Sequence, residues 1–187
     1  MSQIVLQVSM VTMSVGLYLG TMALNEMAFT ELQEFPGVNW VFLPAGIRLL
    51  CTLLFGVWGV TGIGLATLFI TTQYLFPDQW AYATGLSFVS AMAPYLVYLS
   101  ARHYFGLAES LINLSPHRLL MCSVAFGIVS SGLHHFWFWL NGTAPVSFKS
   151  LAAMITGDII GAIIILYVVK TVLALLPVRS VHDQSRF

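Results

Sequence analysis

The chain has 187 residues, of which 58% are hydrophobic and only 7% are charged, and its mean hydropathy is +0.88. A soluble domain carries about 25% charged residues, so this composition excludes a water-soluble fold and indicates a protein whose main partner is the lipid bilayer. The 7 basic and 7 acidic residues cancel, which leaves no net positive field for nucleic acid. Cys51 and Cys122 form neither a metal-binding spacing nor a disulfide framework.

Six apolar segments predict an all-α, polytopic membrane helix bundle with six transmembrane helices. Lengths near 20 residues match a hydrocarbon core of about 30 Å, and helices satisfy their own backbone hydrogen bonds, as lipid requires. The first segment lacks a basic start and is too long for the apolar region of a secretory signal, so we interpret it as a retained helix. The predicted spans are residues 4–24, 40–58, 61–76, 79–101, 116–140 and 147–176.

Glycine and proline predict where several of these helices begin, bend or end. A glycine-rich turn within residues 59–64 separates the second and third helices. Pro44 fits either the first turn of an ordinary helix or a broken helix beside a carrier's binding site. Ser115 is predicted to cap the fifth helix, and Pro94 to kink the fourth. Pro177 ends the sixth, so residues 1–176 are expected to form a single membrane domain and 177–187 a short cytoplasmic tail.

The distribution of charge between the loops predicts the orientation. The loop 25–39 contains 3 glutamates and no lysine or arginine, whereas the loop 102–118 contains 2 arginines and 2 histidines. Cytoplasmic loops are enriched in lysine and arginine. With an even number of spans, both termini are predicted to be cytoplasmic and the acidic loop to lie outside, in a multi-pass protein of a bacterial inner membrane.

Arg48 and Asp158 are each the isolated charge within a long apolar segment. A charge at membrane depth is expensive, so it usually has a partner and often a function. Counted from the outer surface, the two residues lie at similar depths of about 12 and 13–14 Å, at 1.5 Å per residue. We therefore predict that they are paired. The pair either lines an outward-facing pocket, in which Arg48 holds an anionic group, or only clamps the second helix to the sixth.

A stripe of small and polar residues on the fifth helix places His134 near the same depth. Ser123, Gly127, Ser130 and His134 are spaced by four, three and four residues, so they share one face of a helix. We predict that His134 points inward and exchanges one hydrogen bond with a solute or a packed neighbour. Its neighbour His135 points about 100° away, so the two make a poor metal clamp, and neither a metal nor another cofactor is expected.

Pairs of glycines spaced by four residues indicate close helix packing. They are Gly16 with Gly20 in the first helix, and Gly157 with Gly161 in the sixth. Such small faces let helix backbones approach, either within one molecule or between two copies. The second pair brackets Asp158, so a neighbouring backbone is expected to cover that carboxylate.

Two stretches and one short motif resemble the membrane-associated sensor (MASE-type) domain of bacterial signalling proteins. They are FLPAGIRLL at 42–50, FGVWGVTGIG at 55–64 and GDIIG at 157–161. The resemblance extends over roughly residues 38–177 and implies an integral membrane input module, usually fused to a kinase, cyclase or phosphodiesterase. This chain shows no such fused output domain, so a sensor of this kind is expected to act through a partner protein.

These observations leave several classes of function open. The first is a module that binds or senses a small solute from the outer face and acts through a membrane or cytoplasmic partner. The alternatives are the substrate-binding component of an energy-coupling-factor type importer, which also docks through small residues on an early helix, and a structural subunit of a membrane complex. No nucleophile–base–acid set, phosphate loop, HExxH or CxxC is present, so no enzyme activity is predicted.

Overall fold

The computed structural model describes residues 2–35, 37–106, 115–142 and 147–175. Within these ranges the chain is a bundle of helices with one short hairpin, so the predicted helical bundle is confirmed and the hairpin is an addition to it. The predicted tail at 177–187 lies outside the described residues. The elements are α1 (Gln3–Phe29), β1 (Gln33–Phe35), β2 (Val38–Asn39), α2 (Leu43–Phe55), α3 (Val57–Ile70), α4 (Trp80–Phe105), α5 (Pro116–Asn141) and α6 (Phe148–Leu175).

Four helical segments in the described part of the chain are long and apolar enough to cross a membrane. They are Gln3–Leu32, which joins α1 to a following 3-10 turn, and Trp80–Phe105, Pro116–Asn141 and Phe148–Val172. Large apolar side chains on these helices point out of the bundle, as lipid-facing side chains do. The structure therefore indicates a membrane protein. By contrast α2 has 13 residues, a length of about 20 Å, and α3 has 14 before it passes into a π-helical turn (Thr71–Leu75).

The boundary between α2 and α3 differs from the predicted one. The glycines assigned to a turn, Gly59, Gly62 and Gly64, all lie inside α3, and the chain reverses at Gly56, whose φ of +56° favours glycine. A Cβ on Gly59 would overlap the Cys51 carbonyl, and one on Gly62 would lie 2.6 Å from the Val11 carbonyl oxygen. These glycines are contact points between helices, and for this reason their density did not mark a turn.

Other features predicted for the helices agree with the structure, except for the end of α1. The Ser115 hydroxyl accepts a hydrogen bond from the Arg118 amide (3.3 Å), so Ser115 caps α5 as predicted. Pro44 lies in the first turn of α2, which is an ordinary continuous helix, so the broken-helix alternative is wrong. α4 is likewise helical through Pro94. α1 extends to Phe29, five residues beyond its predicted end at residue 24.

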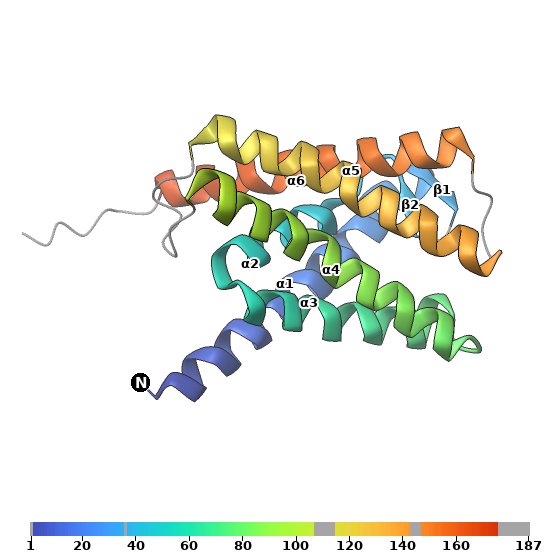
Figure 1. The fold of residues 1–187 in the computed structure, drawn as a ribbon, viewed down its shortest axis with the longest axis horizontal. Coiled ribbons are helices and arrows are strands. Elements are labelled where there is room, and N and C mark those ends of the chain that lie inside the picture. Colours follow the sequence, from blue (N-terminus) through green and yellow to red (C-terminus); the bar gives the residue numbers. More distant parts are fainter. Residues whose placement is uncertain (1, 36, 107–114, 143–146, 176–187) are drawn as a thin grey trace, which may run out of the picture.

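Successive helices run in opposite directions along the bundle (Figure 1). The first residues of α1 and the last described residues of α6 lie toward the same end, and the β1–β2 hairpin lies at the opposite end. α2 packs against α1, α3 and α6, while α5 packs against α4 and α6. Of the 13 residues of α2, 9 are buried, so this short helix forms the centre of the bundle.

The glycine pairs of α6 and α1 lie in different surroundings. A Cβ on Gly157 would overlap the Asn39 carbonyl, and one on Gly161 would overlap the Phe42 carbonyl, so α6 touches the backbone at the start of α2 directly. Around Gly16 and Gly20 on α1, no atom of another described helix lies within 4 Å of the Cβ position. The close approach therefore belongs to the α2–α6 contact, which is where Arg48 and Asp158 meet.

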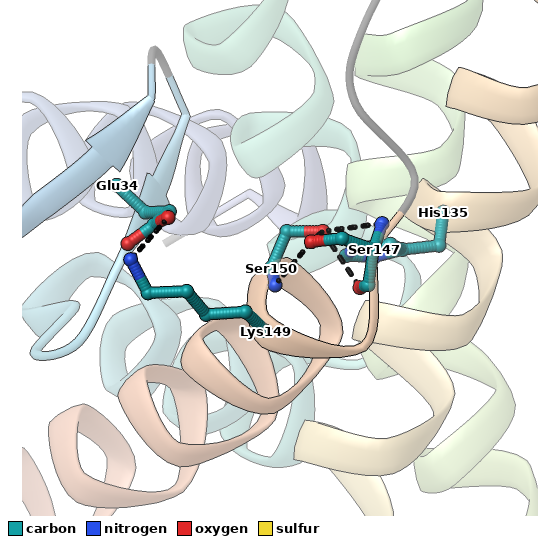
Figure 2. A network of polar contacts seen from close by, with 5 residues as sticks. All are labelled: Glu34, His135, Ser147, Lys149 and Ser150. Atoms are coloured by element: carbon teal, nitrogen blue, oxygen red, sulfur yellow. Dashed lines mark hydrogen bonds and ion pairs between the residues drawn. The ribbon is translucent and has the colours of Figure 1, made fainter.

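Polar contacts join the hairpin, α5 and α6 at the hairpin end of the bundle (Figure 2). Lys149 Nζ on α6 lies 2.8 Å from Glu34 Oε1 on β1. Near the same helix start, the Ser147 hydroxyl accepts a hydrogen bond from the Ser150 amide (3.0 Å), and His135 Nε2 on α5 lies 3.0 Å from Ser150 Oγ. These contacts fix the end of α6 nearest to Asp158.

Candidate functional site

The start of α2 is held by hydrogen bonds from two other helices, and this positions Arg48 one turn further on. The first amides of a helix have no partner within it. Here the Leu43 amide donates to Asn25 Oδ1 on α1 (2.8 Å), and the Phe42 amide donates to the Gly157 carbonyl on α6 (3.2 Å). Pro44 has no amide hydrogen to satisfy. The backbone entering α2 is thus fixed between α1 and α6.

The structure brings Arg48 and Asp158 together in the interior of the bundle. Arg48 Nη2 donates to Asp158 Oδ1 at 3.3 Å, and the two side chains are 2% and 1% exposed. The guanidinium also lies between two aromatic rings, with its Cζ 5.4 Å from the ring centroid of Phe42 and 5.3 Å from that of Phe126. A desolvated cation–π contact stabilises a buried guanidinium by about 2 kcal/mol. The rings therefore supplement a hydrogen bond that is long for a charged pair.

The ion pair leaves polar atoms without protein partners. Arg48 Nε, Asp158 Oδ2 and Ser130 Oγ are buried and make no hydrogen bond of good geometry within the described residues, although the Ser130 hydroxyl lies beside the Asp158 carboxyl. A guanidinium has five N–H donors, and a buried donor or acceptor without a partner costs about 1–3 kcal/mol. A pair that served only as a clamp would be expected to use both carboxylate oxygens. The unused donor and acceptors make this the least satisfied polar region of the described core.

His134 on α5 points inward and is 4% exposed. Its Nε2 lies 2.9 Å from Ser90 Oγ on α4, and its Nδ1 lies 2.7 Å from the Ser130 carbonyl oxygen. A carbonyl can only accept, so a neutral ring carries its proton on Nδ1 and accepts at Nε2 from the serine hydroxyl. His135 instead points toward α6, where its Nε2 meets Ser150. The two histidines therefore take part in separate contacts.

Arg48 and His134 line one cavity of about 40 Å³. One water needs about 10–15 Å³, so the cavity holds on the order of three water-sized groups. The hairpin residue Gly37 also lines it, so the cavity lies toward the hairpin end of the bundle. Asp158 is not one of its lining residues, but it contacts Arg48, which does line the cavity.

Three hydroxyl side chains of this cavity were not identified from the sequence. Thr67 on α3, Thr71 in the π-helical turn that follows it, and Ser90 on α4 line it together with Arg48 and His134. Thr71 Oγ1 also lies 2.8 Å from Ser87 Oγ, which joins α3 to α4. The sequence did contain a signal. Thr67 and Thr71 are four residues apart and Ser87 and Ser90 are three apart, so each pair shares one helix face. The cavity is thus polar on the α3 and α4 sides as well as at Arg48.

The arrangement offers hydrogen-bonding groups, including a buried cation, to the cavity. In the described part of the chain, no three His, Cys, Asp or Glu side chains lie close enough together to hold a metal ion. Comparisons with protein-family models, with curated proteins and with solved structures found no match. The function must therefore be argued from the cavity and the ion pair themselves.

Proposed function

We propose that this chain is an integral membrane module that binds a small solute at the Arg48–His134 cavity and acts through a partner protein. The observation that carries the proposal is that a buried cation with an unused donor and an inward-facing histidine line the same small cavity. Pockets between membrane helices are mostly apolar with a few placed polar groups, as this one is.

The volume and chemistry of the cavity suggest the class of solute. About 40 Å³ suits a molecule of a few heavy atoms. Arg48 would donate to an anionic oxygen, Asp158 would orient the guanidinium, and His134 would exchange one hydrogen bond through the edge that now meets Ser90. A short carboxylate or a small oxyanion satisfies these requirements, because a guanidinium matches two oxygens on a planar group.

We further propose that all six helices cross a bacterial inner membrane, with both termini in the cytoplasm. Support comes from the placement of charge at the two ends. The hairpin end carries the glutamates of residues 26–34 and Asp78, with Lys149 as the one described cation among them, whereas the other end carries Arg102, Arg118 and Lys170. Since basic residues favour the cytoplasmic side, the hairpin and the cavity beneath it would face outward.

A binding measurement on the purified protein tests the solute site. Formate and nitrite should raise the thermal stability of the wild-type protein in a concentration-dependent way, because a ligand that binds only the folded state stabilises it. Citrate, which is too large for the cavity, is the control. Ser90→Ala removes a lining hydroxyl but keeps the ion pair, so it should weaken the response without abolishing folding. Equal responses to formate and citrate, or an unchanged response in Ser90→Ala, would contradict the proposal.

The partner distinguishes the proposed sensor from its alternatives. The resemblance to membrane-associated sensors favours a kinase, cyclase or phosphodiesterase partner. The importer alternative requires an ATPase pair, and the open positions around Gly16 and Gly20 on α1 are compatible with its way of docking. A structural subunit would instead copurify with one large stable assembly. Affinity purification from native membranes, followed by identification of the stoichiometric partners, separates these three outcomes.

A further inference from the structure

A second, larger concavity lies at the end of the bundle opposite to the hairpin. It has a volume of about 890 Å³ and is formed by the start of α1, the α2–α3 junction and the last turns of α4. These three segments lie toward the left end of the bundle in Figure 1. The proposed solute site does not include it, since the two concavities share no lining residue.

The polar side of this cleft centres on Arg102. Arg102 Nη1 donates to the Tyr98 hydroxyl (3.3 Å), and the guanidinium carbon lies 5.7 Å from the centroid of the Tyr98 ring. Tyr98 is itself held against the α2–α3 junction, because a Cβ on Gly56 would lie 3.2 Å from its hydroxyl oxygen. Among the described residues, Arg102 has no carboxylate within salt-bridge distance. The guanidinium therefore rests on Tyr98 with no carboxylate of the described residues beside it.

The rest of the cleft changes from polar to apolar with depth. The amide side chains of Gln3 and Gln7 line the α1 side of the cleft, and Trp58 lines it at the α2–α3 junction. Tryptophan and tyrosine side chains are typical of the headgroup level of a bilayer. Leu53 and Met10 continue the wall toward the middle of the bundle. This order of groups matches a phospholipid, with its phosphate at the charged rim and an acyl chain against the leucine wall.

We propose that this cleft binds an anionic phospholipid through its phosphate group. The proposal rests on the orientation given above, which places Arg102 in the cytoplasmic leaflet, where anionic lipids are concentrated. Basic pockets between helices on that side bind lipid headgroups, and the planar guanidinium can offer a phosphate two parallel donors. The anion compensates the charge that no described side chain neutralises.

Lipid retention by the full chain tests this proposal. The protein is extracted from vesicles of phosphatidylcholine mixed with phosphatidylglycerol, and the bound lipids are counted by native mass spectrometry. Wild type should retain phosphatidylglycerol in preference to phosphatidylcholine. Arg102→Gln should weaken that preference about fivefold, the equivalent of the roughly 1 kcal/mol that one basic contact contributes. Arg102→Lys keeps the charge without the planar donors and should give an intermediate preference, which remains measurable if Arg102→Gln folds poorly.

Two matched variants and one soluble probe complete the test. Arg118→Gln removes a cation from the same end, but Arg118 lies over Phe105 and does not line the cleft, so the lipid preference should remain. Ser90→Ala alters only the solute cavity and should also retain the lipid, which separates failure of this proposal from failure of the proposed function. Equal losses in Arg102→Gln and Arg118→Gln would indicate general surface attraction and overturn the site. If free glycerol phosphate were retained by the cleft as well as phosphatidylglycerol is, the proposal that a lipid occupies the cleft would be overturned.

Discussion

Gly161 on α6 lies directly against the Phe42 carbonyl at the start of α2, and a Cβ at this position would overlap the carbonyl oxygen. Gly157, one turn earlier, meets the Asn39 carbonyl in the same way and accepts a hydrogen bond from the Phe42 amide. The contact is between two backbones, so it has no flexible side chain that could move aside. It sets the separation of α2 and α6, and hence the geometry of Arg48 and Asp158 between them.

Gly161→Ala should therefore destabilise the protein by about 1–3 kcal/mol or more, the usual cost of an added methyl group in a tightly packed interior. Gly20→Ala is the matched control, because no atom of another described helix lies within 4 Å of a Cβ there. Thermal unfolding in detergent, followed by fluorescence-detected gel filtration, measures both. Equal melting temperatures for the two variants would show that α2 and α6 do not approach closely in the folded protein.

Arg48 and Asp158 should depend on each other energetically. Removing either partner leaves a lone buried charge, so Arg48→Ala and Asp158→Ala should each cost about 3–5 kcal/mol. The double variant should recover part of that loss, because it leaves no charge behind. A double-mutant cycle on unfolding free energies measures the coupling, and strictly additive losses would mean that the two charges are independent.

Loss of the Ser90–His134 contact should lower the stability of the protein more than loss of the hydroxyl of an ordinary helix serine. Ser90→Ala leaves His134 Nε2 buried without its partner, which should cost about 1–3 kcal/mol. Ser100→Ala on the same helix is the control, since the exposed Ser100 hydroxyl only donates to the Leu96 carbonyl of its own helix. Chemical unfolding of both variants tests this, and a stability loss at Ser100 as large as that at Ser90 would speak against the buried contact.

Sequence patterns predicted the long helices because length and apolarity decide them. α4, α5 and α6 begin and end within a few residues of their predicted bounds, apart from a longer α4 end. Glycine was ambiguous, because the same residue permits a turn and a close helix contact. Gly59 and Gly62 were predicted to form a turn, but in the structure they are contact points between helices. Gly161 was predicted to be a contact point, and a backbone does lie against it. The packing of α3 against α1 and α2 shows that Gly59 and Gly62 are contact residues rather than turn residues.

The candidate site was partly accessible to the same reasoning. Charge isolation and depth pointed to Arg48 and Asp158, because a lone charge in an apolar helix needs a partner. Thr71 and Ser90 were missed because hydroxyls in apolar helices usually donate to their own backbone, as Thr71 also does. Whether these side chains point into a common cavity depends on how α3 and α4 pack against each other. The residue pattern within one helix does not contain that information.

The proposed orientation predicts which introduced thiols react from outside the cell. Cys51 and Cys122 are buried at 0% and 1% exposure, so they should give little background labelling. With a membrane-impermeant maleimide, Glu31→Cys near the hairpin should react in intact cells. Tyr104→Cys at the end of α4, where the tyrosine is 77% exposed, should react only after permeabilisation.

Trp58→Cys at the α2–α3 junction extends this test to the two short helices. If α2 and α3 both cross the membrane, this thiol should behave like Tyr104→Cys and react only from the cytoplasmic side, because the junction and the end of α4 line the same cleft. If the two helices instead form a hairpin that does not cross, Trp58→Cys should react from outside or not at all. Labelling of Tyr104→Cys in intact cells, with protection of Glu31→Cys, would reverse the orientation, and the Arg102 cleft would then face the outer leaflet.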